Sequence, residues 1–412
     1  MTRASTPGWD QLTQPGGARL LAEISALRQS GETPSAIAQR VRSESFDHDL
    51  IAAALTQSDL RERAGQKFGA LADRMLFTPA GLEQASRLAV AELHATRFAT
   101  AGAASVADLG CGLGAESLAF LRAGMRVRAV EIDALTAEFA RHNLAVQASA
   151  LESAKFDVLL GDATEVGAGD ADAVFLDPAR RTSGHRNTKR VSSADYAPSL
   201  DFTFGAARAA RSGGVKLGPG FERELIPEDA EAQWVSIDGA LVEMSLWFGE
   251  AARPGIRRVA TVIHSGSKST GPKSVSELTS ESDSEDAPAQ ELGTYLYEPD
   301  GAVIRSRLIG KLARDLHAGM LHEHIAYLTS ETLQTTPFAQ AFRIVEELPF
   351  REKDLKRALQ ARSIGKLEIK KRGVDVDPAA LRTRLRLKGE NSATLILTRS
   401  ASKHLALLAE RC

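Results

Sequence analysis

Cysteine is scarce in this chain, whose 412 residues include only Cys111 and Cys412. Two cysteines are too few for a disulfide framework, and they argue against a zinc cluster. No apolar run approaches the roughly 18 residues that a membrane span needs, and residues 1–8 lack the apolar core of a signal peptide. The net charge of −2 gives no overall field that would attract nucleic acid. We therefore expect a cytoplasmic enzyme without a membrane segment or a metal centre.

The length and composition are those of a globular protein with several domains. Hydrophobic residues make up 43% and charged residues 25% of the chain, which is ordinary, and the length suggests two or three domains. Residues 1–96 are expected to form a helical region, because the leucines and the isoleucine between positions 20 and 27 recur at helical spacing. Pro34 and Pro79, each after a threonine, indicate helix starts within this region.

The most informative stretch is Val106–Gly114, an apolar run that breaks into the alternate glycines Gly110, Gly112 and Gly114. A helical pattern follows, so the stretch predicts a strand, a glycine turn and a helix. Glycine lets a ligand approach closer than a Cβ would allow, and the helix start offers unpaired N–H groups. We therefore expect a nucleotide-type site. With Ala115, the glycines also fit the dinucleotide pattern G-x-G-x-x-G/A, so the stretch alone does not select the nucleotide.

Strands and helices alternate from about residue 103 to 217, which predicts a doubly wound α/β sheet. The expected strands are 104–109, 127–130, 156–160, 173–176 and one near 215–217. Later strand patterns lack clear helices between them and suit an antiparallel pair that closes the sheet; they lie at 234–237, 241–248 and 259–264. Residues 265–291 are rich in Ser, Thr, Pro, Glu and Asp and are expected to form a disordered acidic linker.

Acids stand at the ends of the first three strands, at the edge where ligands sit in such sheets. Glu131 ends the second strand, where an acid can accept hydrogen bonds from ribose hydroxyls. Asp162, which Ala163 follows, is placed to hold an adenine amino group, although loop aspartates are also common turn residues. Asp108 precedes the first glycine by two residues. We expect it to orient the loop or to contact the amino-acid end of the ligand.

Together, Asp108–Gly114, Glu131, Asp162 and Asp177-Pro178 resemble the class I S-adenosylmethionine-dependent methyltransferases. That family has Asp/Glu-x-Gly-x-Gly-x-Gly, then an acid after strand two, an Asp after strand three and Asp/Asn-Pro after strand four. Four motifs in the right order are more specific than the glycines alone and displace the dinucleotide interpretation. The resemblance implies a Rossmann-like methyltransferase domain over residues 97–264 and S-adenosylmethionine as cofactor. These acids and glycines, with Ala163, would bind it.

A narrower resemblance covers most of the chain from about residue 65 onward. The segments 82–86, 177–181, 216–220 and 295–299 look like those of bacterial methyltransferase-like proteins with a THUMP-like C-terminal domain. The resemblance implies an α+β THUMP-like domain over residues 292–412. It also implies methyl transfer onto RNA, because THUMP domains in RNA-modifying enzymes bind RNA.

Asp177 and Pro178 are the expected catalytic residues. Methyl transfer from a sulfonium is an in-line displacement, so the enzyme mainly positions a nucleophile and excludes water. Related enzymes that methylate exocyclic amines carry Asp/Asn-Pro-Pro-Tyr/Phe at this position. This chain has Ala179 and Arg180 after the proline, with no aromatic residue. The difference leaves open whether the target is an exocyclic amine.

Two groups of residues are expected to contact the substrate. Arg180 and Arg181 suit a phosphate clamp or stacking on a base, with an internal salt bridge as the alternative, and Tyr196 follows them.

The second group lies between Arg351 and Lys388, where thirteen basic residues stand against five acids. Its central run is Lys370, Lys371 and Arg372. Such clustering suits a phosphate backbone, although basic runs are more often only solvated faces.

Two other candidates, a cysteine and a group of histidines, are expected to have structural rather than catalytic or metal-binding roles. Cys111 is expected to be a small packed residue rather than a methylating nucleophile. His317, His322 and His324 are expected to lie on a surface helix rather than to bind a metal.

The first hypothesis is thus a methyltransferase that acts on a base in structured RNA, such as tRNA or rRNA. The alternatives are a methyltransferase for a protein or a small molecule, and a non-catalytic RNA-binding protein that retains the cofactor fold as a scaffold.

Overall fold

The computed structural model describes the chain except residues 1–6, 43–45, 150, 152–153, 181–194 and 267–271. The chain divides into two compact units. Unit 1 comprises residues 1–217, 222–230 and 245–253, whereas unit 2 comprises residues 218–221, 231–244 and 254–412. None of the helices in the described ranges is long and apolar enough to cross a membrane.

Unit 1 begins with the expected helical region. Its helices are α1 (Pro15–Gln29), α2 (Pro34–Arg42), α3 (His48–Phe68), the 3-10 helix η1 (Gly69–Arg74), α4 (Pro79–Gln84) and α5 (Leu88–Thr100). The helix starts predicted at Pro34 and Pro79 are confirmed as the first residues of α2 and α4. At α4 the Thr78 hydroxyl accepts a hydrogen bond from the Gly81 N–H, which satisfies a donor that the helix start leaves open.

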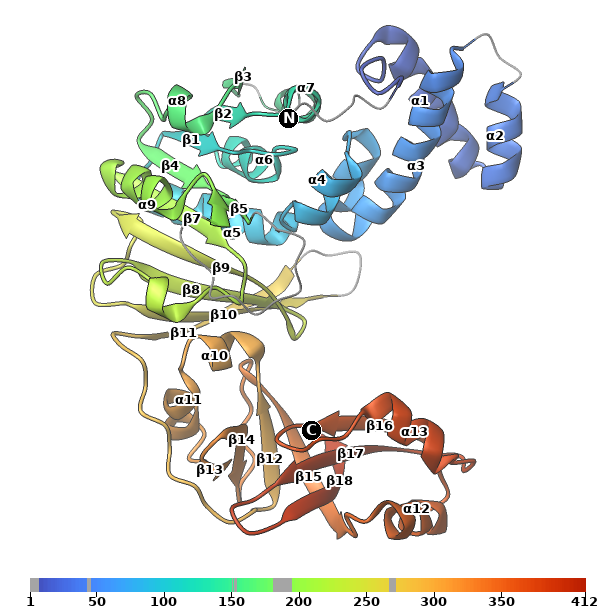
Figure 1. Cartoon of the computed structure of the whole chain (residues 1–412), viewed down its shortest axis with the longest axis vertical. Helices are drawn as coiled ribbons and strands as arrows, with labels where there is room; N and C mark the ends of the chain where they lie inside the picture. Colours follow the sequence, from blue (N-terminus) through green and yellow to red (C-terminus); the bar gives the residue numbers. More distant parts are fainter. Residues whose placement is uncertain (1–6, 43–45, 150, 152–153, 181–194, 267–271) are drawn as a thin grey trace. The chain divides into compact units, whose positions relative to one another are not determined.

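The predicted α/β sheet of unit 1 is confirmed. Its elements are β1 (Ser105–Leu109), α6 (Ala115–Arg122), β2 (Arg126–Glu131), α7 (Ala134–Ala148), β3 (Phe156–Leu160), α8 (Ala163–Val166), β4 (Ala173–Leu176), α9 (Leu200–Ala209) and β7 (Ser212–Leu217). The five strands pair in parallel in the order β7-β4-β1-β2-β3 (Figure 1). Because β1 lies between β4 and β2, the loops after these central strands share one edge of the sheet.

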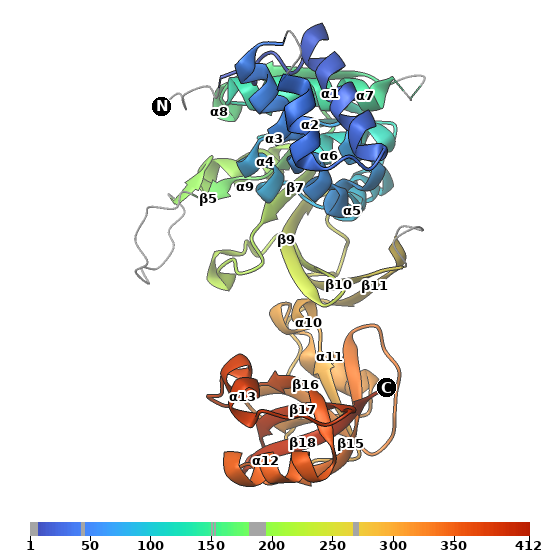
Figure 2. The ribbon, with the colours of Figure 1, turned by 90° about the vertical axis from the view of Figure 1, so that its right-hand side faces the viewer.

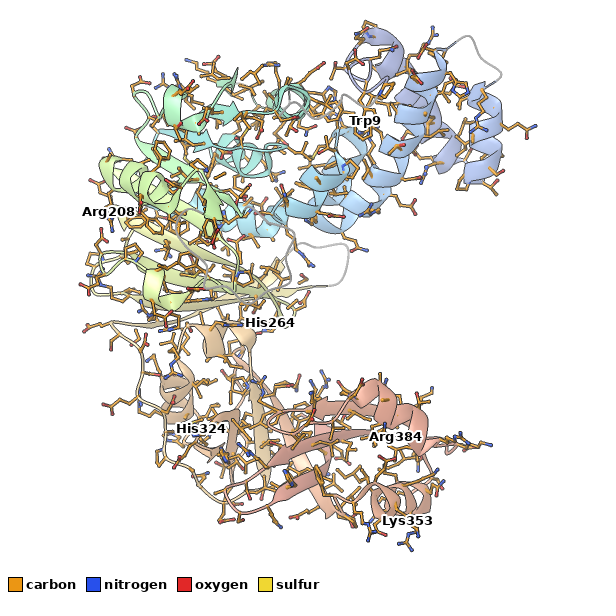
Figure 3. The ribbon with its side chains drawn as sticks, in the orientation of Figure 1. Trp9, Arg208, His264, His324, Lys353 and Arg384 are labelled. Atoms are coloured by element: carbon orange, nitrogen blue, oxygen red, sulfur yellow. The ribbon has the colours of Figure 1, made fainter. Side chains whose placement is uncertain are left out.

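The core of unit 1 lies between this sheet and its helices. Phe98, Phe120, Phe175 and Trp247 are almost completely buried, and their ring centroids lie 5.6 to 6.3 Å apart in pairs. Full burial of each such side chain stabilises the fold by about 2 to 3 kcal/mol. Trp9, labelled in Figure 3, stacks on Phe139 of α7 and so packs the N-terminal segment against the same domain. The loops at the carboxyl edge of the sheet therefore extend from a closely packed core.

Unit 2 contains further strands. They are β8 (Glu231–Ile237), the first part of β9 (Ala240–Gly249), β10 (Arg258–Ser265) and β11 (Pro272–Ser280). The strands expected near 234–237, 241–248 and 259–264 are all present. However, β10 pairs in parallel with β8, and its antiparallel partner is β11, which was not among the expected strands.

The expectation of a disordered linker at residues 265–291 is wrong for the described part of that segment. β11 is hydrogen-bonded to β10, and Leu278 of β11 is 5% exposed. Beyond it, the Ser284 N–H donates to the Arg307 carbonyl and the Gln290 N–H to the Met320 carbonyl. The polar composition is compatible with order because the segment pairs its backbone with neighbouring elements and needs little apolar surface of its own.

The C-terminal part of unit 2 is the expected α+β domain. Its elements are β12 (Tyr295–Pro299), α10 (Gly301–Arg305), α11 (Ile309–Asp315), β13 (Gly319–His322), β14 (Ile325–Ser330), β15 (Ala339–Leu348), α12 (Glu352–Ala361), β16 (Ile364–Lys371), α13 (Pro378–Leu385), β17 (Asn391–Arg399) and β18 (His404–Arg411). The sheet order is β13-β14-β12-β15-β18-β17-β16. Helices α12 and α13 (Figure 2) pack their leucines into one apolar cluster with residues of β16, β17 and β18.

Candidate active site

The glycine loop joins β1 to α6 at the carboxyl edge of the unit 1 sheet. Gly110, Gly112 and Gly114 have φ values of +92°, +55° and +83°, a region that costs other residues about 1 to 2 kcal/mol each. The N–H groups of Gly110 and Cys111 donate to the Val130 carbonyl at 2.9 and 3.0 Å, which ties the loop to the end of β2. The loop thus needs glycine for its backbone conformation, as the sequence predicted.

Glu131 lies directly against this loop. One carboxylate oxygen accepts the Gly112 N–H at 3.0 Å and the other accepts the Asp133 N–H at 2.8 Å. Burial raises the pKa of Glu131 above its ordinary value, and these backbone hydrogen bonds oppose that shift. The next residue, Ile132, is 68% exposed, and Leu160 at the end of β3 is also exposed. These two apolar side chains were not among the expected site residues.

Asp162 is the N-cap of α8. Its carboxylate accepts the Thr164 N–H at 2.8 Å and the Thr164 hydroxyl at 2.7 Å, and these bonds lower its pKa. Ala163 is the first residue of the helix and is buried. This is the turn geometry that the sequence left as an alternative. The contact of Asp162 with an adenine amino group stays a prediction.

Asp108 lies beneath the loop, 2% exposed, and accepts a hydrogen bond of 2.6 Å from the Ser117 hydroxyl on α6. Burial, together with the nearby carboxyls of Glu116 and Asp177, raises its pKa to about 8. Two roles were expected for Asp108, to orient the loop or to contact the ligand. The hydrogen bond to Ser117 joins β1 to the first turn of α6 and so fits the first role.

Asp177 follows β4 and is one strand away from the glycine loop. Its backbone carbonyl lies 3.8 Å from the position that a Cβ would take at Gly110. Its carboxylate is 34% exposed and lies 2.6 Å from the ammonium of Lys216 on β7. Pro178 is buried. Two expected groups, the glycine loop and the acid after strand four, are therefore neighbours.

Lys216 was not among the expected site residues, although the sequence placed it in the fifth strand. Because β4 and β7 are parallel with Leu176 opposite Val215, the next residues along the two strands are Asp177 and Lys216. The signal was thus the position of Lys216 at the carboxyl end of the strand next to Asp177.

The residues expected to contact substrate near Asp177 are only partly described. Arg180 lies in β5 (Ala179–Arg180), whose partner is β6 (Tyr196–Ala197), with Arg180 opposite Tyr196. Arg181 lies outside the described residues. Tyr196 is 8% exposed, so its side chain offers little surface for stacking on a base in this conformation. The substrate contacts of these residues stay predictions.

The basic run in unit 2 is split between two environments. Along β16 the side chains of Lys370 and Lys371 point to opposite faces, because strand residues alternate. Lys370 forms an ion pair of 2.6 Å with Glu298, whereas Lys371 is exposed. The guanidinium of Arg372 lies over the ring of Tyr327. Of the three, Lys371 has the geometry that best suits contact with a solvent-side phosphate.

The remaining candidates are Cys111 and the histidine group near residues 317–324. Cys111 is 6% exposed, and burial raises the pKa of its thiol, which suits a packed residue. His322 ends β13 and His324 lies in the turn that follows, so the surface helix expected for this histidine group is wrong. Among the described residues, no group of three or more His, Cys, Asp or Glu is arranged to hold a metal ion.

Several parts of this chain are similar to known proteins. Family models match at residues 68–193 (methyltransferase small domain), 339–411 (THUMP domain-like) and 6–64 (a domain of unknown function). The chain is 32% identical over 355 residues to an uncharacterized S-adenosylmethionine-dependent methyltransferase of Mycobacterium tuberculosis, in strains CDC 1551 and H37Rv. That match covers 84% of this chain and 92% of the relative.

A solved structure has the same fold over nearly the whole chain. It is that of a protein from Porphyromonas gingivalis W83 that is assigned as a methyltransferase, with a TM-score of 0.74 and 22% identity. The match covers 96% of this chain and 98% of that chain. That likeness concerns the fold, whereas the relative in Mycobacterium tuberculosis and the two domain matches show the family: this chain belongs to the S-adenosylmethionine-dependent methyltransferases and carries a THUMP-like domain at its C-terminus.

Proposed function

We propose that this chain transfers the methyl group of S-adenosylmethionine to a base in structured RNA, such as a tRNA or an rRNA. The observation that carries the proposal is the proximity of Asp177 to the glycine loop, where its carbonyl lies 3.8 Å from a Cβ position at Gly110. In-line displacement requires the methyl donor and the accepting atom side by side, so an acceptor-orienting acid belongs next to the cofactor loop.

The groups at the sheet edge fit this cofactor. A carboxylate has about four lone-pair sites, so Glu131 can accept ribose hydroxyls in addition to its two backbone N–H partners. We expect Asp162 to accept a hydrogen bond from the adenine amino group, and the exposed Ile132 offers apolar surface for the adenine ring. The N–H groups at the start of α6 follow directly on the glycine loop, and we expect them to lie near the amino-acid end of the cofactor. The bound cofactor supplies an electrophilic methyl group on a positively charged sulfur.

At the accepting atom, Asp177 orients the nucleophile. Its carboxylate accepts a hydrogen bond from an N–H group of the base, and the carbonyl of Pro178 serves as a second acceptor. The nitrogen would form its new N–C bond to the methyl group that S-adenosylmethionine would supply, with the sulfur leaving as a neutral thioether. The proton lost by the nitrogen passes to the Asp177 carboxylate and then to water.

RNA as the substrate class rests on the C-terminal domain. The THUMP domain-like match covers residues 339–411 and includes the whole basic segment between Arg351 and Lys388. Lys371 is exposed there, and the local excess of basic over acidic residues suits a phosphate backbone.

Mass spectrometry of modified nucleosides tests the proposal. Each RNA class from a deletion strain is compared with its parent, and the deletion is complemented with the wild type, with Asp177→Ala or with Asp157→Ala. Asp157 is an exposed acid on β3 and serves as the matched control. We expect one methylated nucleoside to disappear on deletion and to return with the wild type and Asp157→Ala, but not with Asp177→Ala. The identity of that nucleoside also decides whether the target is an exocyclic amine.

Other outcomes contradict parts of the proposal. If all RNA nucleosides are unchanged in the deletion strain while the protein binds S-adenosylmethionine in a calorimeter, the substrate is a protein or a small molecule. If no S-adenosylmethionine binds, the chain is a non-catalytic protein on this fold. Restoration by Asp177→Ala would remove that residue from the mechanism.

A further inference from the structure

We propose that Lys216 is a positioning residue for methyl transfer, which holds the Asp177 carboxylate in the orientation that receives the accepting atom. The inference rests on the proposed function in giving Asp177 that role. It starts from a cluster of charged side chains that no sequence motif brought together: Lys216, Asp177 and Glu116.

Lys216 is largely buried and lies close to three oxygen atoms from different parts of unit 1. Its side chain is 12% exposed, and its ammonium lies 2.6 Å from an Asp177 carboxylate oxygen and 3.8 Å from a Glu116 carboxylate oxygen. The same nitrogen lies 3.5 Å from the carbonyl of Gln84, at the end of α4. The 2.6 Å contact between Lys216 and Asp177 is charge-assisted, which places it among the stronger hydrogen bonds in proteins, and its lysine end is largely shielded from water.

Glu116 is itself held in place. Its side chain is 7% exposed and lies in the first turn of α6, the helix that begins after Gly114. On its other side, His94 lies 3.8 Å away, and the far nitrogen of this ring is 3.3 Å from the Ser245 hydroxyl. The His94 ring also packs on Phe175, with centroids 4.9 Å apart. The carboxylate beneath Lys216 is therefore part of a packed core and not a mobile surface group.

This arrangement links the two halves of the reaction site. Glu116 belongs to the helix that the glycine loop leads into, and Asp177 belongs to the motif that receives the substrate. Lys216 contacts both carboxylates, so it sets the direction of Asp177 relative to the loop before the substrate arrives. A misplacement of about 1 Å in such a group can cost on the order of 100-fold in rate, because in-line transfer depends on alignment.

The chain offers a matched control in Lys67. Its ammonium donates to the carbonyls of Leu82, Glu83 and Ala85 at 2.7, 2.9 and 2.6 Å, at the same end of α4 where Lys216 approaches Gln84. Both lysines thus support the end of α4, and Lys216 in addition forms an ion pair with Asp177. Comparing Lys216→Met with Lys67→Met separates positioning of Asp177 from support of the helix.

The experiment measures methyl transfer from radiolabelled S-adenosylmethionine to total RNA from the deletion strain, with the full-length protein. We expect Lys216→Met to lower kcat by about 100-fold while the KM for S-adenosylmethionine changes by less than about twofold. Lys216→Arg keeps a cation next to Asp177 and should recover at least about tenfold of this loss. Lys67→Met should lower the melting temperature but keep kcat within about twofold of the wild type.

The outcomes are decisive in both directions. If Lys67→Met lowers kcat as much as Lys216→Met, or if Lys216→Arg recovers nothing, the positioning role is wrong. If the wild type itself does not methylate RNA, the proposed function fails, and crystal structures with S-adenosylhomocysteine then decide the role of Lys216. The Asp177 carboxylate should move away from its wild-type position in Lys216→Met; an unchanged position overturns the proposal.

Discussion

The carboxyl edge of the unit 1 sheet and the basic segment between Arg351 and Lys388 organise their charges in opposite ways. At the sheet edge, Asp108, Glu131 and Asp177 come from separate strands, yet each contacts the glycine loop, the helix after it or a buried partner. In the basic segment the charges are close in sequence but spread over α12, β16 and α13. Four of its thirteen basic side chains form ion pairs with acids in the described part of the chain, namely Arg357, Arg362, Lys370 and Arg384.

The difference concerns what a cluster of charges in a sequence indicates. Residues that follow successive parallel strands are brought together by the sheet, so a few of them form a site. Charged residues that are only close together in the sequence lie on several faces of the domain, and some of them form ion pairs with nearby acids. In Figure 3, Lys353 on α12 and Arg384 on α13 are two such charges; Lys353 is exposed, whereas Arg384 is paired with Glu352. Composition alone therefore overstates the positive surface of this segment.

The largest effect that would sharpen the comparison is expected at the glycine loop. Gly112→Ala should weaken S-adenosylmethionine binding at least about tenfold, since a Cβ there occupies a loop position at φ +55° where the ligand must approach the backbone. Gly124→Ala is the matched control, because Gly124 also has a positive φ and open space around its Cβ position but lies after α6. Calorimetric titration and thermal melting compare the two. Equal losses of affinity would mean that backbone strain, not the loop, determines binding.

A smaller effect is expected in the basic segment. If Lys371 contacts phosphate, Lys371→Ala should reduce the slope of log K against log salt for RNA binding by about one. Arg384→Ala removes another exposed basic residue, which already has Glu352 as partner, and should leave the slope nearly unchanged. Fluorescence anisotropy with labelled tRNA over about 50 to 200 mM salt measures both slopes. If both substitutions have the same effect, the segment acts through its total charge rather than through particular residues.

The smallest effect is expected in the pH dependence of folding stability, which tests how strongly Asp108 is buried at the sheet edge. The folded-state pKa of Asp108 is raised from 3.8 to about 8, so the folded protein binds more protons than the unfolded chain between these values. The protonated Asp108 therefore makes its full contribution to stability below pH 3.8, and this contribution is lost as the pH rises to about 8. Asp108→Asn removes this loss.

Melting temperatures at about pH 6 and pH 9 provide the measurement. The wild type should lose roughly 2 °C or more relative to Asp108→Asn over this interval. Asp162→Asn serves as the control, since the pKa of Asp162 is lowered and its contribution is lost only when the pH falls into the acid range. An identical pH dependence in the wild type and Asp108→Asn would show that Asp108 is ionised and accessible in the folded protein.

The strands of unit 1 were predictable because each is a short apolar run that ends in a turn signal. Phe156–Leu160 and Ala173–Leu176 have the bounds that the pattern indicated. The strand β11 was not predictable in the same way, because its residues are polar and its order comes from pairing with β10. The histidine group near 317–324 was misassigned for a related reason, since its residues belong to a strand and the following turn.

What the amino-acid order determined is the set of acids and glycines at the strand ends, because parallel strands must present these positions at one edge whatever the details of packing. The sheet register and burial decided the rest. Lys216 faces Asp177 only because β7 lies beside β4 with Val215 opposite Leu176. Glu116 and His94 support that pair only because the helices α5 and α6 pack against the sheet. Contacts between residues distant in sequence depend on the register of the whole sheet, and no local pattern encodes them.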